Sequence, residues 1–142
     1  MTFKKKAALR KKWKKMSDAA KLLLISPFWG WTDCHTLQVA GRTVCYGWHP
    51  VLHPKKKNRY ETPLPDCLRD LNAMYQAEEI FSPYKRTMDE LERECLYLTN
   101  LEMIVIQDND DNLSFRKYRA TAAQRAEAFF LTVMEPKEKN PE

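Results

Sequence analysis

Residues 35–50 read HTLQVAGRTVCYGWHP, and this stretch decides the fold class. Polar and apolar residues alternate on both sides of Ala40-Gly41, which is the period-two pattern of a half-buried β-hairpin. Glycine tolerates the positive φ angles of a tight turn, so Gly41 fits the tip of this hairpin. A half-buried hairpin turns its apolar side toward a core. That side comprises Leu37, Val39, Val44 and Tyr46.

Helices are predicted on both sides of the hairpin. Residues 3–25 contain neither proline nor glycine and predict one helix, of which the part from about Trp13 onward packs on the body. After the hairpin, four prolines and a run of lysines predict an exposed loop over residues 49–65. Apolar residues at three- and four-residue spacing then predict a second helix through residues 64–81.

Two capping boxes predict where the later helices begin. Residues 87–90 (TMDE) open one helix, which is expected to turn Leu91, Cys95 and Leu98 inward. Residues 121–124 (TAAQ) open the closing helix. The residues of the closing helix that are predicted to face inward are Ala122, Ala126, Phe129, Phe130 and Val133.

Residues 101–120 lie between these two helices and predict a second hairpin. Residues 103–106 (MIVI) are typical of a buried strand, residues 108–112 (DNDDN) of a turn, and residues 113–118 of a more polar edge strand. The predicted order is therefore helix, hairpin, helix, helix, hairpin, helix. This order indicates an α+β fold in which two β-hairpins form one antiparallel sheet packed with helices, as a sandwich.

Charge and length divide the 142-residue chain into three parts. Residues 1–15 hold seven lysines and Arg10 without an acidic residue, whereas the whole chain carries a net charge of only +5. We therefore expect a basic helical arm over residues 1–16, one domain over residues 17–135, and a disordered charged tail over residues 136–142.

The basic arm has two interpretations. It can bind the phosphate backbone of a nucleic acid, with an affinity that falls steeply as salt is added, or it can be a solvated extension without a partner. The candidate nucleic-acid contacts are Lys5, Arg10, Lys11, Lys12, Lys14 and Lys15.

The chain carries no predicted secretory or membrane segment. Its charged amino terminus lacks a following apolar core, and its longest apolar runs are too short to span a bilayer. We expect a cytoplasmic protein that does not bind membranes and that can form a homo-oligomer. The four cysteines, with no CxxC pair, are expected to be reduced and half-buried.

A metal site is weakly indicated by Cys34, Cys45, His49 and His53. Zinc requires four such ligands in a tetrahedron, but the paired C-x2-C knuckle is absent and nearby prolines hold the histidine segment extended. Two ordinary hairpin cysteines and partly exposed histidines explain the same residues, so we favour no metal and leave the question open. The acidic residues 108–111 fit a turn better than a calcium loop, which needs a central glycine and a closing glutamate.

Catalytic signatures are missing from the sequence. It has no G-x-S-x-G, P-loop or G-x-G-x-x-G motif, and three glycines cannot build a glycine-rich phosphate cradle. We therefore expect a protein that is not an enzyme and needs no cofactor.

Aromatic and basic residues around the hairpin are candidates for binding an anionic nucleotide. Aromatic rings stack on bases and neighbouring cations neutralise phosphates. Trp31 and Trp48 are better explained as core residues. The candidate ligand-binding residues are Trp29, Arg42, Lys56, Lys57, Arg59 and Tyr60.

The helix DLNAM and the closing helix ATAAQRA resemble the phage ABA sandwich domain family over roughly residues 17–134. Two departures are the lysine-rich arm and the long segment 82–98. The resemblance implies a small phage or prophage accessory protein, located in the host cell cytoplasm, which can counter host defence by sequestering a nucleotide signal. The alternatives are a nucleic-acid-binding accessory protein that uses the arm, and a protein–protein adaptor. The matching residues are Asp70, Leu71, Asn72, Ala73, Met74, Ala120, Thr121, Arg125 and Ala126.

Overall fold

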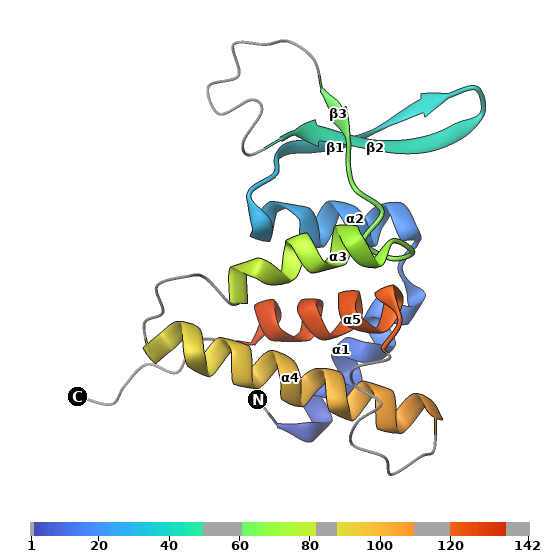
Figure 1. Ribbon diagram of the computed structural model, residues 1–142. Coiled ribbons are helices and arrows are strands. Elements are labelled where there is room, and N and C mark those ends of the chain that lie inside the picture. Colours follow the sequence, from blue (N-terminus) through green and yellow to red (C-terminus); the bar gives the residue numbers. More distant parts are fainter. Residues whose placement is uncertain (1, 50–60, 82–87, 110–119, 136–142) are drawn as a thin grey trace.

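A computed structural model describes residues 2–49, 61–81, 88–109 and 120–135. In this described part the fold is α+β: five helices form a body, and a three-stranded antiparallel sheet stands on one side of it (Figure 1). The helices are α1 (Phe3–Lys15), α2 (Asp18–Ile25), α3 (Leu71–Glu78), α4 (Met88–Asn109) and α5 (Ala122–Met134). Two short 3-10 helices, η1 (Ser26–Trp29) and η2 (Glu79–Phe81), follow α2 and α3.

The hairpin predicted around Ala40-Gly41 is confirmed. β1 (Thr32–Val39) pairs with β2 (Arg42–Trp48), and the short β3 (Thr62–Pro63) joins the other edge of β2. Ala40 and Gly41 have φ angles of 51° and 76°, the left-handed backbone that a two-residue hairpin turn requires.

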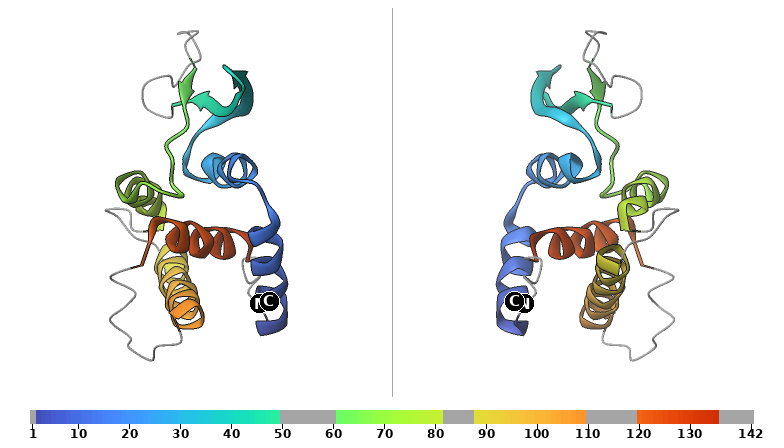
Figure 2. Two further views of the ribbon diagram at one scale, coloured as in Figure 1. Left: turned by 90° about the vertical axis from the view of Figure 1, so that its right-hand side faces the viewer. Right: turned by 90° about the vertical axis from the view of Figure 1, so that its left-hand side faces the viewer.

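α5 is the central element of the helical body. Figure 2 shows it between α1 and α4, with α2 and α3 above it. Residues 125–132 of α5 are all buried, because small alanines let the neighbouring helices approach closely while Phe129 and Phe130 fill the space between them. Of the two predicted capping boxes, the one at Thr121 is confirmed, whereas Thr87 lies outside the described residues. The Thr121 hydroxyl accepts from the Gln124 backbone N–H, and the Gln124 side chain accepts from the Thr121 N–H.

The prediction of one helix over residues 3–25 is wrong, because the chain breaks at Ser17. The Ser17 hydroxyl accepts a hydrogen bond from the Ala20 backbone N–H at 3.2 Å and so caps α2. Serine favours such a cap over a helix interior, and this local preference lets α1 and α2 take different directions.

The second helix is shorter than predicted. It begins at Leu71 instead of near Pro65, because the Asp70 carboxylate accepts from the Asn72 N–H at 2.9 Å and caps α3 there.

The predicted second hairpin is wrong wherever the structure describes it. Residues 103–106 belong to α4, which continues to Asn109, and residues 110–119 lie outside the described residues. The buried residues Tyr97, Leu101 and Ile104 are spaced four and three apart, which is helical periodicity. The β-branched run IVI masked this period. The predicted inward face was wrong for the same helix, since Leu91, Cys95 and Leu98 are exposed.

Two hydrophobic clusters hold the described residues together. The larger one lies among the five helices and includes Trp13, Met74 and Phe129. The smaller one, around Trp31 and Cys45, lies between α2 and one face of the sheet. The sheet therefore packs on helices through the face of Cys45. The prediction that the side of Leu37 and Val39 turns toward a core is wrong, because both residues are exposed and neither belongs to a hydrophobic cluster.

Candidate nucleic-acid interface

Helix α1 is docked on the body through one side. The Trp13 side chain is buried, and its ring stacks on Phe130 of α5 with centroids 4.8 Å apart and planes at 22°. Lys21 of α2 places its ammonium 5.2 Å from the centre of the same ring. The arm therefore has an aromatic anchor, as expected for the part from Trp13 onward.

Arg10 is buried in this docking interface, unlike the other predicted arm residues. Its Nε donates to Glu127 Oε1 of α5 at 2.6 Å, and its Nη2 donates to Asp108 Oδ1 of α4 at 3.0 Å. Nη1 donates to the Gln107 side chain. Burial opposes the charge of Arg10, but the hydrogen bonds and attraction of Glu127 outweigh it, so the pKa of the guanidinium is raised. Arg10 fastens α1 to the body and does not face solvent.

Lys6 makes a second polar contact on the same side of α1. Its Nζ donates to Asn100 Oδ1 of α4 at 2.9 Å, and the buried Asn100 amide donates in turn to Thr132 of α5 at 3.1 Å. Lys6, Arg10 and Trp13 are four and three residues apart and so lie on one helix face.

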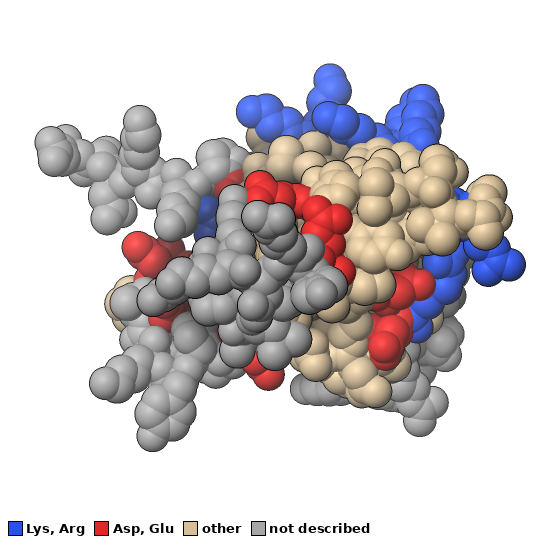
Figure 3. Space-filling model, turned by 90° about the horizontal axis from the view of Figure 1, so that it is seen from above, with Lys and Arg blue, Asp and Glu red and all other residues tan. Residues whose placement is uncertain are grey.

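The rest of the α1 surface carries six exposed lysines. Lys4, Lys11 and Lys15 follow one another at intervals of seven and four residues and form a row along the helix. No acidic residue lies in α1. Figure 3, in which every Lys and Arg is blue, shows cations along the top and the right-hand side of the view. We call these residues the basic face: Lys4, Lys5, Lys11, Lys12, Lys14 and Lys15.

The first turn of α1 is electrostatically unfavourable. A helix N-terminus carries positive partial charge, and Lys4 and Lys5 add to it with no acid in the turn. Docking through Arg10 and Trp13 compensates for this cost. Lysines in a first helical turn go against the helix dipole and give no structural gain, and such an exception is typical of residues kept for function.

The predicted ligand-binding residues do not converge in the described part of the structure. Trp29 lies next to Trp31, with ring centroids 6.0 Å apart, and packs against both hydrophobic clusters. Arg42 lies at the exposed start of β2, six residues from Trp48. Six strand residues span about 20 Å, so Arg42 is far from the base of the hairpin. Lys56, Lys57, Arg59 and Tyr60 lie outside the described residues.

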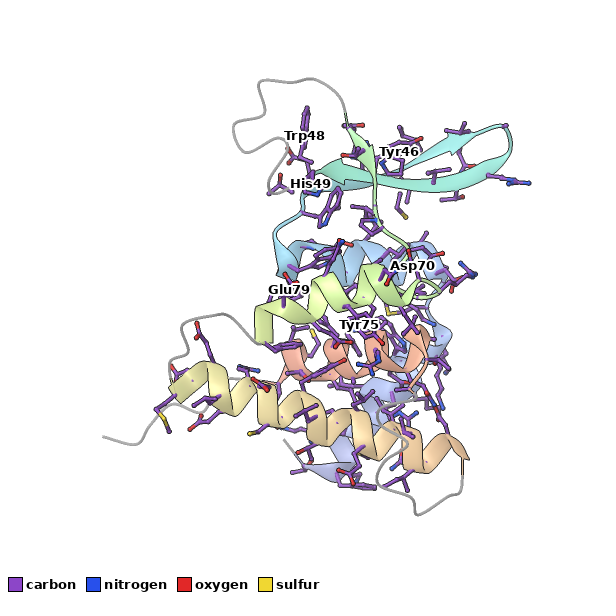
Figure 4. All side chains as sticks on the ribbon, in the orientation of Figure 1. Tyr46, Trp48, His49, Asp70, Tyr75 and Glu79 are labelled. Atoms are coloured by element: carbon purple, nitrogen blue, oxygen red, sulfur yellow. The ribbon has the colours of Figure 1, made fainter. Side chains whose placement is uncertain are left out.

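The core prediction is confirmed for Trp31 but not for Trp48. Trp31 is 3% exposed and its ring contacts the His49 ring edge-on at 5.0 Å. Trp48 is half-buried and points away from the helices, whereas the neighbouring His49 points toward them (Figure 4).

The described residues contain no group of three or more His, Cys, Asp or Glu side chains that can hold a metal ion. All four cysteines are free. Cys45 and Cys67 are buried, Cys34 is half-buried and Cys95 is exposed, so the half-buried prediction holds for Cys34 alone. Burial raises the pKa of Cys67 to about 12 and also raises the pKa of Cys34 and Cys45. Such thiols are poor nucleophiles.

A pocket of about 270 Å³ opens beside η2 and the start of α4, with apolar walls that include Phe28 and Phe81. Arg93 lines this pocket. Its guanidinium donates to the carbonyls of Thr132 and Glu135 at 2.7 and 3.0 Å and so caps the end of α5. Because the Arg93 guanidinium is already hydrogen-bonded to these backbone carbonyls, the pocket is poorly suited to an anionic ligand.

A partly buried ion pair joins α3 to α5. Arg125 Nη1 donates to both carboxylate oxygens of Glu78 at 3.1 and 3.2 Å, and its guanidinium lies 5.2 Å from the ring centre of Tyr75. These contacts hold two helices together.

Among the described helices none is both long and apolar enough to span a membrane. Comparison of the chain with protein-family models, with curated proteins and with solved structures finds no match. The resemblance to the phage ABA sandwich family stays a prediction.

The docking residues on α4 and α5 were missed by sequence reasoning. Glu127, Asp108 and Asn100 are far from α1 in sequence, and single polar residues give no pairing signal. The helical spacing of Lys6, Arg10 and Trp13 was the available signal, because it separates one side of α1 from the lysine row.

Proposed function

We propose that the protein binds the phosphate backbone of nucleic acid through the basic face of α1, without catalysing a reaction. The observation that supports this most strongly is the division of the cations of α1. Arg10 and Lys6 contact α4 and α5, whereas six lysines face solvent with no acid in the helix. A docked helix holds these six charges at fixed spacing.

The dimensions of the lysine row suit a phosphate backbone. Lys4 and Lys15 are eleven residues apart, which corresponds to about 16 Å along a helix axis. One strand of duplex DNA carries a phosphate every 3.4 Å or so, so the row spans about five phosphates. The contact is with the backbone, and we expect little dependence on base sequence.

The nucleotide-ligand hypothesis has less support. It requires Trp29 and Arg42 to meet at one site, and these residues lie at different ends of the hairpin. The pocket beside η2 has its cation engaged with the end of α5. A phage accessory role is compatible with either activity and rests on the family resemblance alone.

The test measures the affinity for a fluorescent duplex oligonucleotide by anisotropy at fixed salt. The row variant Lys4→Ser/Lys11→Ser/Lys15→Ser should bind about 100-fold more weakly, because three phosphate contacts and their counterion release are lost. Its thermal stability should stay close to wild type, since the lysines are exposed. The oligonucleotide should be recovered uncleaved after incubation with the protein, because we propose binding without a reaction.

Two controls separate a specific face from general charge. The matched variant Lys4→Arg/Lys11→Arg/Lys15→Arg keeps every charge and should bind nearly as well as wild type. Arg69→Ser removes a cation that already contacts Asp18 and Asp66 and should change little. If the serine row variant binds like wild type, the basic face is only a solvated surface and the proposal is refuted.

A further inference from the structure

The end of the hairpin projects from the body as a strand pair that no described helix covers. Residues 36–43 are all exposed, although successive strand residues point to opposite faces of the pair. β3 pairs with Tyr46 and Gly47, near the base of the hairpin, and does not reach these residues. Figure 1 shows this end of the hairpin extending beyond α2. We call residues 36–43 the projecting tip.

Two apolar side chains of the projecting tip face solvent. Leu37 is 44% exposed and Val39 is 47% exposed, and neither belongs to a hydrophobic cluster of the described residues. The hairpin is packed closer to its base, where the Cys45 thiol lies 3.7 Å from the Ala19 carbonyl oxygen of α2. A two-stranded hairpin has little stability by itself in water. Exposed apolar side chains on such a projection are typical of a surface that contacts a partner.

The charge of the projecting tip indicates the kind of partner. Its single charged residue is Arg42, which is exposed at the start of β2. Figure 2 shows α1, α2 and the hairpin along the same side of the molecule, with α2 between the other two. The tip therefore continues the side that carries the basic face and has the same sign of charge. This charge complements a polyanion that extends past α1.

We propose that the projecting tip enters the major groove of a DNA duplex held by the basic face, and that Arg42 donates to the edge of a guanine there. The inference rests on the proposed function, because the lysine contacts hold the duplex against this side of the molecule. It adds one base contact to the phosphate contacts. A single arginine reads about one base pair, so the preference among sequences stays small.

The dimensions of the projecting tip fit the major groove. A strand pair is about 10 Å wide, whereas the major groove of B-form DNA is about 12 Å wide and the minor groove about 6 Å. Four residues of a strand extend about 13 Å, which exceeds the depth of the major groove, about 8.5 Å. The strand pair can therefore reach the floor of this groove. The deep, narrow major groove of an RNA duplex does not admit it, so the partner is DNA.

Arg42 is placed to reach a base edge. It pairs with Val39, and these two residues flank the turn at Ala40-Gly41. Arg42 therefore lies at the end of the tip that enters the groove first. A guanidinium donates in parallel to O6 and N7 of guanine, the two acceptors that this base presents in the major groove. Serine is too short to make the same contact from this position.

The test uses two DNA duplexes of one sequence, and in the second every guanine is replaced by 7-deazaguanine. This base lacks the N7 acceptor, but every phosphate is kept. By anisotropy at fixed salt, wild type should bind the second duplex about 5-fold more weakly, because one hydrogen bond is lost. Arg42→Ser should bind the ordinary duplex about 10-fold more weakly than wild type and should no longer distinguish the two duplexes. The matched control Arg69→Ser removes another exposed arginine and should distinguish them as wild type does.

The salt dependence separates this inference from the proposed function. Arg42→Ser loses a base contact and should keep the wild-type salt slope, whereas the row variant Lys4→Ser/Lys11→Ser/Lys15→Ser should flatten it. Circular dichroism should show every variant folded, since the substituted residues are exposed.

Three results would overturn one proposal or both. If wild type binds both duplexes equally, or Arg42→Ser keeps the wild-type affinity, the tip lies outside the groove and is left for a protein partner. A row variant with the wild-type slope refutes the phosphate contacts of α1 instead. A wild-type protein that binds neither duplex refutes the proposed function and this inference together.

Discussion

Replacing Arg10 by methionine should destabilise the protein far more than replacing any lysine of the basic face. Arg10 is 7% exposed and donates to Glu127, which is 6% exposed. Methionine fills similar space but leaves the Glu127 carboxylate buried without its partner. Breaking a buried pair in this way costs about 3–5 kcal/mol in the free energy of unfolding. A domain of this size has about 5–15 kcal/mol in total, so the loss is large.

Urea unfolding followed by tryptophan fluorescence measures this loss, and two variants complete the design. Lys11→Met changes the next residue, which is exposed, and should alter the free energy of unfolding by less than about 0.5 kcal/mol. Arg10→Met/Glu127→Leu removes both charges and should recover most of the stability, because an apolar pair tolerates burial. If Arg10→Met is as stable as Lys11→Met, Arg10 does not fasten α1 and the account of the docked helix is wrong.

Two further predictions concern titratable groups. The hydrogen bond of His35 to the Asp33 carbonyl, together with Glu61, raises the pKa of His35, so its charged form stabilises the fold. The stability difference between wild type and His35→Gln should therefore be full below about pH 6.5 and disappear as pH rises through the raised pKa; a difference that grows with pH would contradict this sign. Cys95 is exposed whereas burial raises the pKa of Cys67 to about 12, so Cys95 should react rapidly with a thiol reagent in the folded protein and Cys67 only after unfolding. Mass spectrometry of the labelled peptides checks this order, and early labelling of Cys67 would contradict it.

Local sequence signals predicted the elements whose structure depends on local chemistry. The turn at Ala40-Gly41 needs left-handed backbone, and the capping box at Thr121 satisfies backbone groups within one helical turn. Each of these features depends on a few neighbouring residues, so the sequence alone predicts it. The breaks at Ser17 and Asp70 are capping signals of the same kind that sequence reasoning overlooked.

Tertiary packing decided the features that could not be predicted. The run IVI at residues 104–106 has strand propensity, but it lies in helix α4. There the helical spacing of Tyr97, Leu101 and Ile104 places these side chains in the core. The face of the hairpin that meets α2 depends on the close fit at Gly47, which alternation alone does not report. At the candidate site, composition identified the basic segment, and only the position of Glu127 on α5 distinguished Arg10 from the lysines.

The central claim is that the exposed lysines of docked α1 bind phosphates, and the salt dependence of duplex binding tests it most directly. Each neutralised phosphate contributes about −0.9 to the slope of log K against log salt. If four lysines engage at once, wild type should show a slope of about −4. The row variant Lys4→Ser/Lys11→Ser/Lys15→Ser should then show about −1, because three contacts are lost, and the matching arginine variant should keep the wild-type slope. Equal slopes for wild type and the serine variant would contradict the claim.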